Sequence, residues 1–154
     1  MASETLFAAL HYPATALYSL SVLYFAIVLS LKGDVPTRRN RAHKFLSWGP
    51  VLGLSMGALI AGGLGLHYLA MDGFHWSTQD GEQQRTLIKH GVFLVLWVSH
   101  FHLEIWTQEP LRKLGNETQD ELSPAWSKAH RQVRRQLVFN SALIVCLGGL
   151  SIWP

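Results

Sequence analysis

The sequence is poor in charge and in cysteine. Asp, Glu, Lys and Arg make up only 15% of the 154 residues and hydrophobic residues 49%, whereas soluble domains are roughly 25% charged. The single cysteine, Cys146, excludes an intrachain disulfide and a cysteine-based zinc or iron–sulfur site. A Walker loop, a dinucleotide-binding glycine motif and a Gly-x-Ser-x-Gly nucleophile motif are also lacking. The composition therefore favours a single transmembrane domain, 1–154, over a soluble enzyme.

Four apolar segments are long enough to cross a bilayer. They cover about 6–31, 45–71, 87–106 and 133–153. Lipid admits only helices or closed barrels, and these segments are longer than ordinary strands. We therefore expect an all-α integral membrane protein, a four-helix bundle.

The charges of the connecting segments predict the orientation. The first and third, 32–44 and 108–135, are rich in Lys and Arg, whereas 72–86 carries Asp72, Asp80 and Glu82 with only Arg85. By the positive-inside rule the basic segments are cytoplasmic, and both termini are extracytoplasmic. Since the net charge is only +3 and the basic residues lie in these segments, the expected partner is the lipid bilayer and not nucleic acid. Tryptophans at or near the span ends are typical of interfacial anchors: Trp48, Trp76, Trp106, Trp126 and Trp153.

With this orientation the histidines fall into an outer and an inner layer. Each outer histidine taken alone is typical of an imidazole at the headgroup level. Together, His11, His67, Lys89 and His90 come from three helices at similar depth, which indicates a shared redox cofactor such as haem. His11, His67 and His90 are the candidate iron ligands. A zinc or iron cluster bound only by side chains is disfavoured, because no span carries a carboxylate at that depth.

The inner layer contains His43, His100, His102 and His130. Lys89 and His100 are eleven residues apart, so they share one face of the third helix about 16 Å apart. Glu104 continues that line, either as a proton-relay carboxylate or as a side chain that reaches the nearby membrane surface. A second haem with His100 as its inner ligand is a further alternative.

Small residues recur at four-residue spacing in the second span, at Gly49, Gly53, Gly57, Ala61 and Gly65. Such a stripe favours close helix packing. A flat cofactor lying against the bare backbone is the alternative, and the two are compatible.

Four stretches resemble the HemJ-type membrane protoporphyrinogen IX oxidases and the related CopD-like four-helix membrane domains. They are "ALH" at 9–11, "RRNRAHKFLSWGP" at 38–50, "LIKHGVFLVLWVSHFHLEIWTQEPLRKL" at 87–114 and "VFNSALIVCLGGLSIWP" at 138–154. The resemblance implies four helices with extracytoplasmic termini in a bacterial-type inner (cytoplasmic) membrane. It also implies a bound haem b and a functional pair that maps onto His11 and Lys89, the candidate catalytic residues. The implied activity is oxidation of protoporphyrinogen IX, with electrons passed to a quinone.

Two other functions fit the same sequence. One is a non-catalytic subunit, haem- or tetrapyrrole-binding or purely structural, within a larger respiratory or photosynthetic complex or a homo-oligomer. The other is CopD-like copper permeation, which three methionines and one cysteine support only weakly.

Overall fold

The computed structural model describes residues 2–70, 81–114 and 123–152, and every regular element in these ranges is a helix. In chain order they are α1 (Ala2–Val28), α2 (Val35–Ser47), α3 (Gly49–Ala70), α4 (Gly81–His102), the π-helical turn η1 (Leu103–Thr107), α5 (Gln108–Leu114) and α6 (Pro124–Ile152). Four stretches are long and apolar enough to span a membrane: Ser3–Val28, Val35–Leu69, Gln83–Leu114 and Pro124–Ile152. The prediction of an all-α protein with four spans is confirmed. Met71, most of the expected outer loop (72–80, with His75 and Trp76) and Trp153 lie outside the described residues.

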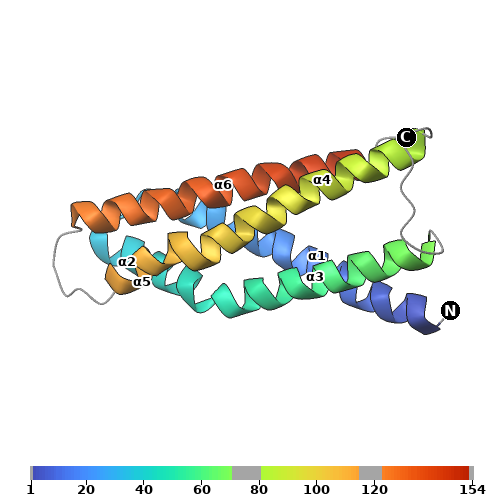
Figure 1. Ribbon diagram of the computed structural model, residues 1–154. Coiled ribbons are helices and arrows are strands. Elements are labelled where there is room, and N and C mark those ends of the chain that lie inside the picture. Colours follow the sequence, from blue (N-terminus) through green and yellow to red (C-terminus); the bar gives the residue numbers. More distant parts are fainter. Residues whose placement is uncertain (1, 71–80, 115–122, 153–154) are drawn as a thin grey trace.

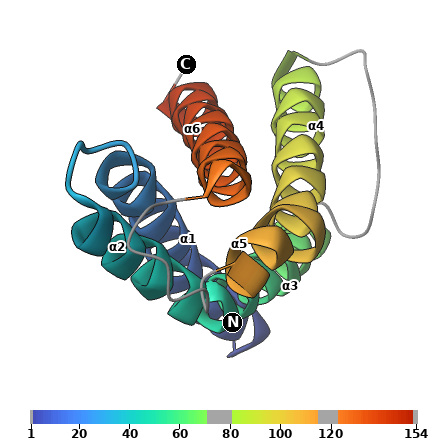
Figure 2. The ribbon, with the colours of Figure 1, turned by 90° about the vertical axis from the view of Figure 1, so that its left-hand side faces the viewer.

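The helices form an elongated bundle in which α1 packs against α3 and α4 packs against α6 (Figure 1). Viewed along the bundle, α6 lies between α1 and α4 and also contacts α1 (Figure 2). The chain begins and ends at one end of the bundle, while α2 and α5 lie at the other. Both termini therefore share an end, and its extracytoplasmic placement stays a prediction.

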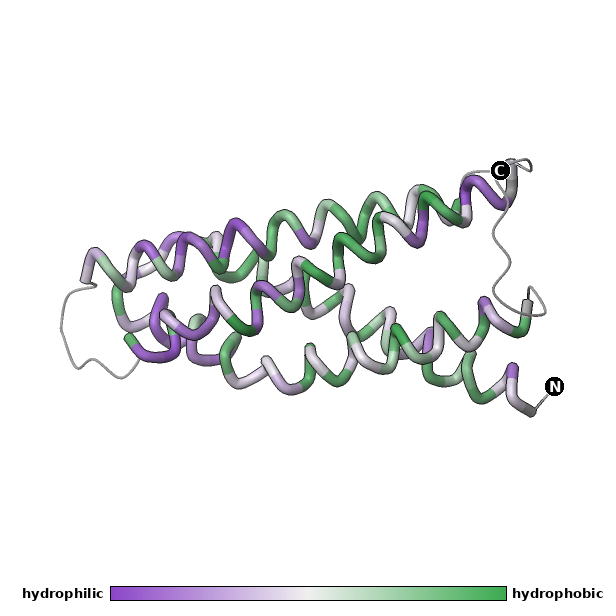
Figure 3. Tube along the Cα trace, in the orientation of Figure 1, coloured by the Kyte–Doolittle hydropathy of each residue, from purple (hydrophilic) through white to green (hydrophobic). Residues whose placement is uncertain are grey.

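The basic segments are more helical than the sequence suggested. Much of 32–44 and of 108–135 was expected to be connecting loop, but α2, α5 and the first turns of α6 occupy most of it. Local caps explain why: Asp34 accepts a hydrogen bond from the Thr37 backbone N–H at 3.1 Å, and the Ser123 hydroxyl accepts one from Trp126 N–H at 3.1 Å. The hydrophilic part of the bundle thus forms a folded polar end, opposite the termini (Figure 3).

The second predicted span, 45–71, is divided between two helices, the end of α2 and α3. Trp48 closes α2, and α3 begins at Gly49. Pro50, which has no backbone N–H, follows directly and fits only the first turn of a new helix. The span predicted from residue 45 therefore contains a helix junction at Trp48 and Gly49.

The prediction that Trp126 is an interfacial anchor is wrong. Its side chain is only 2% exposed, stacks on His130 at 4.8 Å between ring centres, and lies 5.6 Å from the Arg38 guanidinium carbon. Trp48 and Trp106, at 40% and 65% exposed, have the exposure that an anchor requires. Trp126 instead packs α6 onto α2, because the polar end has a core of its own.

Close approach of α1 to α3 explains part of the small-residue stripe. A Cβ at Gly65, a member of the stripe, would overlap the Phe7 ring. Gly62, which lies outside the stripe, is equally confined, because a Cβ there would lie 2.8 Å from His11 N. At Gly53 a Cβ would lie 3.5 Å from the Glu104 carboxylate, whereas at Gly57 it would meet nothing within 4 Å. Helix packing therefore accounts for the α1-facing glycines, and Gly57 is not needed for it.

Candidate functional site

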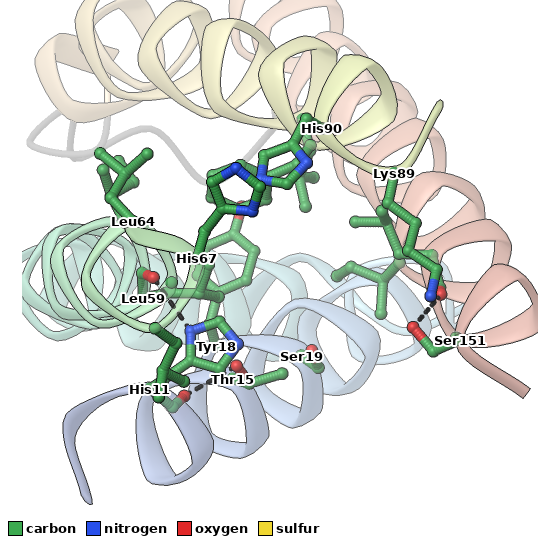
Figure 4. A pocket seen from close by; sticks show the side chains of 18 residues that line it. His11, Thr15, Tyr18, Ser19, Leu59, Leu64, His67, Lys89, His90 and Ser151 are labelled. Carbon is green, nitrogen blue, oxygen red and sulfur yellow. Dashed lines mark hydrogen bonds between the residues drawn. The ribbon is translucent and has the colours of Figure 1, made fainter. Parts of the chain in front are cut away.

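All four spanning helices contribute to one pocket in the half of the bundle nearer the termini. Its volume is about 550 Å³, within the range of roughly 300–1,000 Å³ for cofactor sites. His11 of α1, His67 of α3, and Lys89 and His90 of α4 all line it (Figure 4). The structure brings together the four residues that the sequence grouped as an outer cluster.

His11 is held in a defined orientation. Its Nδ1 lies 3.1 Å from the Leu59 carbonyl oxygen of α3. Because a carbonyl only accepts, Nδ1 carries the proton and the Nε2 lone pair is left for a ligand. This is how a second hydrogen bond sets the tautomer of metal-binding histidines. Gly63 allows the contact, since a Cβ there would lie 3.1 Å from His11 Cε1.

His67 and His90 form a close pair across the gap between α3 and α4. Their ring centres are 4.8 Å apart with the planes at 65°, and His90 Nδ1 donates to the Thr86 carbonyl at 2.7 Å. An iron between two axial imidazoles, at about 2 Å from each, would hold the bonded nitrogens about 4 Å apart and the ring centres well beyond. In this arrangement the two rings are too close to be opposite ligands of one iron.

Lys89 gives the pocket a positive charge. Figure 4 shows its side chain reaching toward α6, near Ser151. Of the described residues that line the pocket, none is Asp or Glu. The pocket is therefore suited to an apolar molecule that carries an anionic group.

The histidines do not form a metal centre by themselves. Among the described residues no group of three or more His, Cys, Asp or Glu is close enough to hold a metal ion. His11, His67 and His90 thus share a pocket without converging on one point. Haem places fewer demands on the protein, because the porphyrin occupies four positions on the iron and only one or two axial ligands are added.

Sequence reasoning missed four polar residues of the same pocket, Ser151 of α6 and three residues of α1. Thr15, Tyr18 and Ser19 line it from α1. They follow His11 by one and two helical turns, so helix phase would have selected them.

His100 lies apart from this cluster. It lines a second cavity of about 280 Å³ with Glu104 and Met56, and it is 3% exposed. No other described lining residue of that cavity is a histidine, so a second haem held by two histidines gains no support. His102 is exposed, and its Nδ1 lies 3.1 Å from the Thr107 hydroxyl.

Comparisons with known proteins add no further constraint on the site. No protein-family model, no curated protein and no solved structure matches this chain significantly.

Proposed function

We propose that the pocket of about 550 Å³ binds haem b and that the protein is a membrane oxidoreductase of the protoporphyrinogen IX oxidase type. One observation carries the proposal: three imidazoles and one ammonium group, from α1, α3 and α4, line a single pocket within the membrane-spanning bundle. Ionisable groups are costly inside a membrane, so their gathering around one cavity indicates a bound partner.

The pocket fits a tetrapyrrole in both volume and lining chemistry. Leu59, Phe93, Leu96 and Leu147 provide apolar surface for the faces of the ring. Lys89 provides a partner for a propionate group of the haem or of a porphyrinogen substrate. His11 provides the orientated Nε2 for the iron. A bound haem supplies the one-electron redox chemistry, and a lipid-soluble quinone is the proposed acceptor.

Purified full-length protein tests haem binding. We expect a Soret band, a reducible α-band and about one haem per chain by haemochrome assay. His11→Ala should lose most of the haem, whereas His43→Ala, an exposed histidine on α2, should retain it. A colourless protein after expression with added haem precursor, with His11→Ala indistinguishable from wild type, would contradict the proposal.

Complementation separates an enzyme from a non-catalytic subunit. We expect the gene to rescue a bacterial strain that lacks protoporphyrinogen oxidase, and Lys89→Ala to abolish the rescue. Lys44→Ala is the matched control, because Lys44 is exposed on α2. Haem binding without rescue, together with co-purification in a large membrane complex, would favour the subunit.

A further inference from the structure

A line of polar side chains leads from the pocket toward the polar end: His100 and Gln108 are buried, and Glu104 between them is half-buried. His100, Glu104 and Gln108 follow one another at four-residue spacing along α4, η1 and α5. His100 is 3% and Gln108 1% exposed. Tyr18, which lines the pocket and is fully buried, meets the His100 ring edge-on at 5.3 Å between ring centres. The line therefore begins at the wall of the pocket.

Three atoms along this line are unsatisfied. His100 Nδ1, Glu104 Oε1 and Gln108 Nε2 are buried and have no hydrogen-bond partner among the described residues. More than about nine in ten buried polar groups in proteins are paired, and exceptions often mark a site of bound water. Three exceptions in sequence on one helical path point to a common cause.

The protein has room for water beside these atoms. The second cavity, about 280 Å³, lies between α3 and α4 and is lined by both His100 and Glu104. A water molecule occupies about 30 Å³, so the space admits a short chain of them. On the α3 side the cavity is lined by Gly53 and Gly57, which have no side chain, and by Met56 and Ile60. Ile60 lines this cavity and the larger pocket alike, so the two are neighbours.

The far end of the line reaches the polar end of the bundle. A Cβ at Gly49, the first residue of α3, would lie 3.4 Å from Gln108 Oε1 and 3.8 Å from Glu104 Oε1. Gln108 begins α5, which Figure 1 places at the end away from the termini. Glu104 itself sits in η1, and π-helical turns are frequent at functional sites.

We propose that Glu104, His100 and water bound in the second cavity form a proton path from the polar end to the larger pocket. The lining of that pocket extends to Ser151 in the last turn of α6, so the pocket continues the path to the end that carries the termini. At each step one group releases a proton toward the pocket and takes up another from the polar-end side. Nothing is oxidised or reduced, and the net change is one proton moved per cycle. Intramembrane carboxylates and histidines are typical of such relays. The path does not depend on what the pocket binds.

Proton flux into vesicles tests the path directly. The full chain is reconstituted in liposomes that contain a trapped pH dye, and a potassium gradient with valinomycin drives protons across. Flux should exceed that of protein-free liposomes, and Glu104→Gln should reduce the excess by about tenfold or more. His100→Gln should do the same and serves as the independent second variant.

Matched variants exclude a general leak. Glu109→Gln makes the same chemical change at a carboxylate near the surface that pairs with Arg112 at 3.4 Å, and it should keep the wild-type flux. His102→Gln is the equivalent control for His100, because His102 is exposed. Circular dichroism confirms that each variant is folded. Flux equal to that of protein-free liposomes, or flux that Glu104→Gln and His100→Gln leave unchanged, overturns the proposal.

Discussion

The absence of a side chain at Gly62 lets α1 approach α3 closely enough to hold His11. A Cβ at this position would lie 2.8 Å from His11 N and 2.9 Å from His11 Cα. Those are backbone atoms, which cannot rotate away as the tip of a flexible side chain can. The bond from His11 Nδ1 to the Leu59 carbonyl depends on the same approach.

Gly62→Ala should therefore force the two helices apart. We expect a loss of about 1–3 kcal/mol in the free energy of unfolding, which is typical of overpacking, together with weaker haem binding. Gly57→Ala is the control, because a Cβ at Gly57 meets nothing within 4 Å. Equilibrium unfolding in mixed detergent micelles measures the stability of Gly62→Ala and of Gly57→Ala, and the haemochrome assay measures how much haem each variant binds. Equal stability of the two variants would show that α1 and α3 can separate at little cost.

Trp126 tests whether the polar end has a core of its own. The side chain is 2% exposed and stacks on His130, so Trp126→Ala should lose about 3–5 kcal/mol, as for other buried large-to-small changes. Trp106→Ala removes the same kind of side chain where it is 65% exposed, and its effect should stay within about 0.5 kcal/mol. Thermal unfolding followed by circular dichroism compares the two. A similar loss of stability in Trp126→Ala and Trp106→Ala would contradict a core at the polar end and favour Trp126 as a surface anchor.

At the scale of the element, α2 shows how a charged stretch becomes a helix. Asp34 caps its first turn, Pro36 falls within that turn, and Arg41 Nη1 donates to the Leu31 carbonyl at 3.0 Å, which ties the preceding turn to the helix. The sequence contains each of these signals. The positive-inside rule concerns charge alone, however, so it predicted the side of the membrane and not the local structure.

The cap on α2 should depend on pH. Hydrogen bonds from the side chain and the backbone of Thr37 hold the pKa of Asp34 below its ordinary value. A lowered pKa in the folded state means that the carboxylate stabilises the helix above its unfolded pKa of about 4. That contribution is lost as the pH falls through the folded pKa. Hydrogen-exchange protection of the first turn of α2, corrected for intrinsic rates, should decline in that acidic window.

Two variants separate the cap from its charge. Asp34→Asn keeps a capping oxygen and should make protection independent of pH, whereas Asp34→Ala should lower it at every pH. Protection that declines equally in Asp34→Asn and wild type would assign the pH dependence to another group.

At the scale of the whole molecule, the bundle separates a polar end from an end that carries both termini and the pocket. This arrangement makes the predicted orientation testable by reporter fusion. Alkaline phosphatase fused to the C-terminus should be active in a bacterial host, and green fluorescent protein fused there should be dark. A fusion after Leu114, at the polar end, should give the opposite pattern. A fluorescent C-terminal fusion with inactive phosphatase would reverse the orientation.

The sequence alone determined the helical class, the four spans and the location of the charged segments, because a bilayer constrains length and hydropathy strongly. It also placed His11, His67, Lys89 and His90 at one depth, since depth follows from position along a helix. Only the tertiary structure decided that these side chains line one pocket and that the His67 and His90 rings pair at 4.8 Å. It likewise placed His100 beside Glu104 in a second cavity and buried Trp126. Those outcomes depend on how each helix is rotated against its neighbours, and that rotation is set by packing across helices that are distant in sequence.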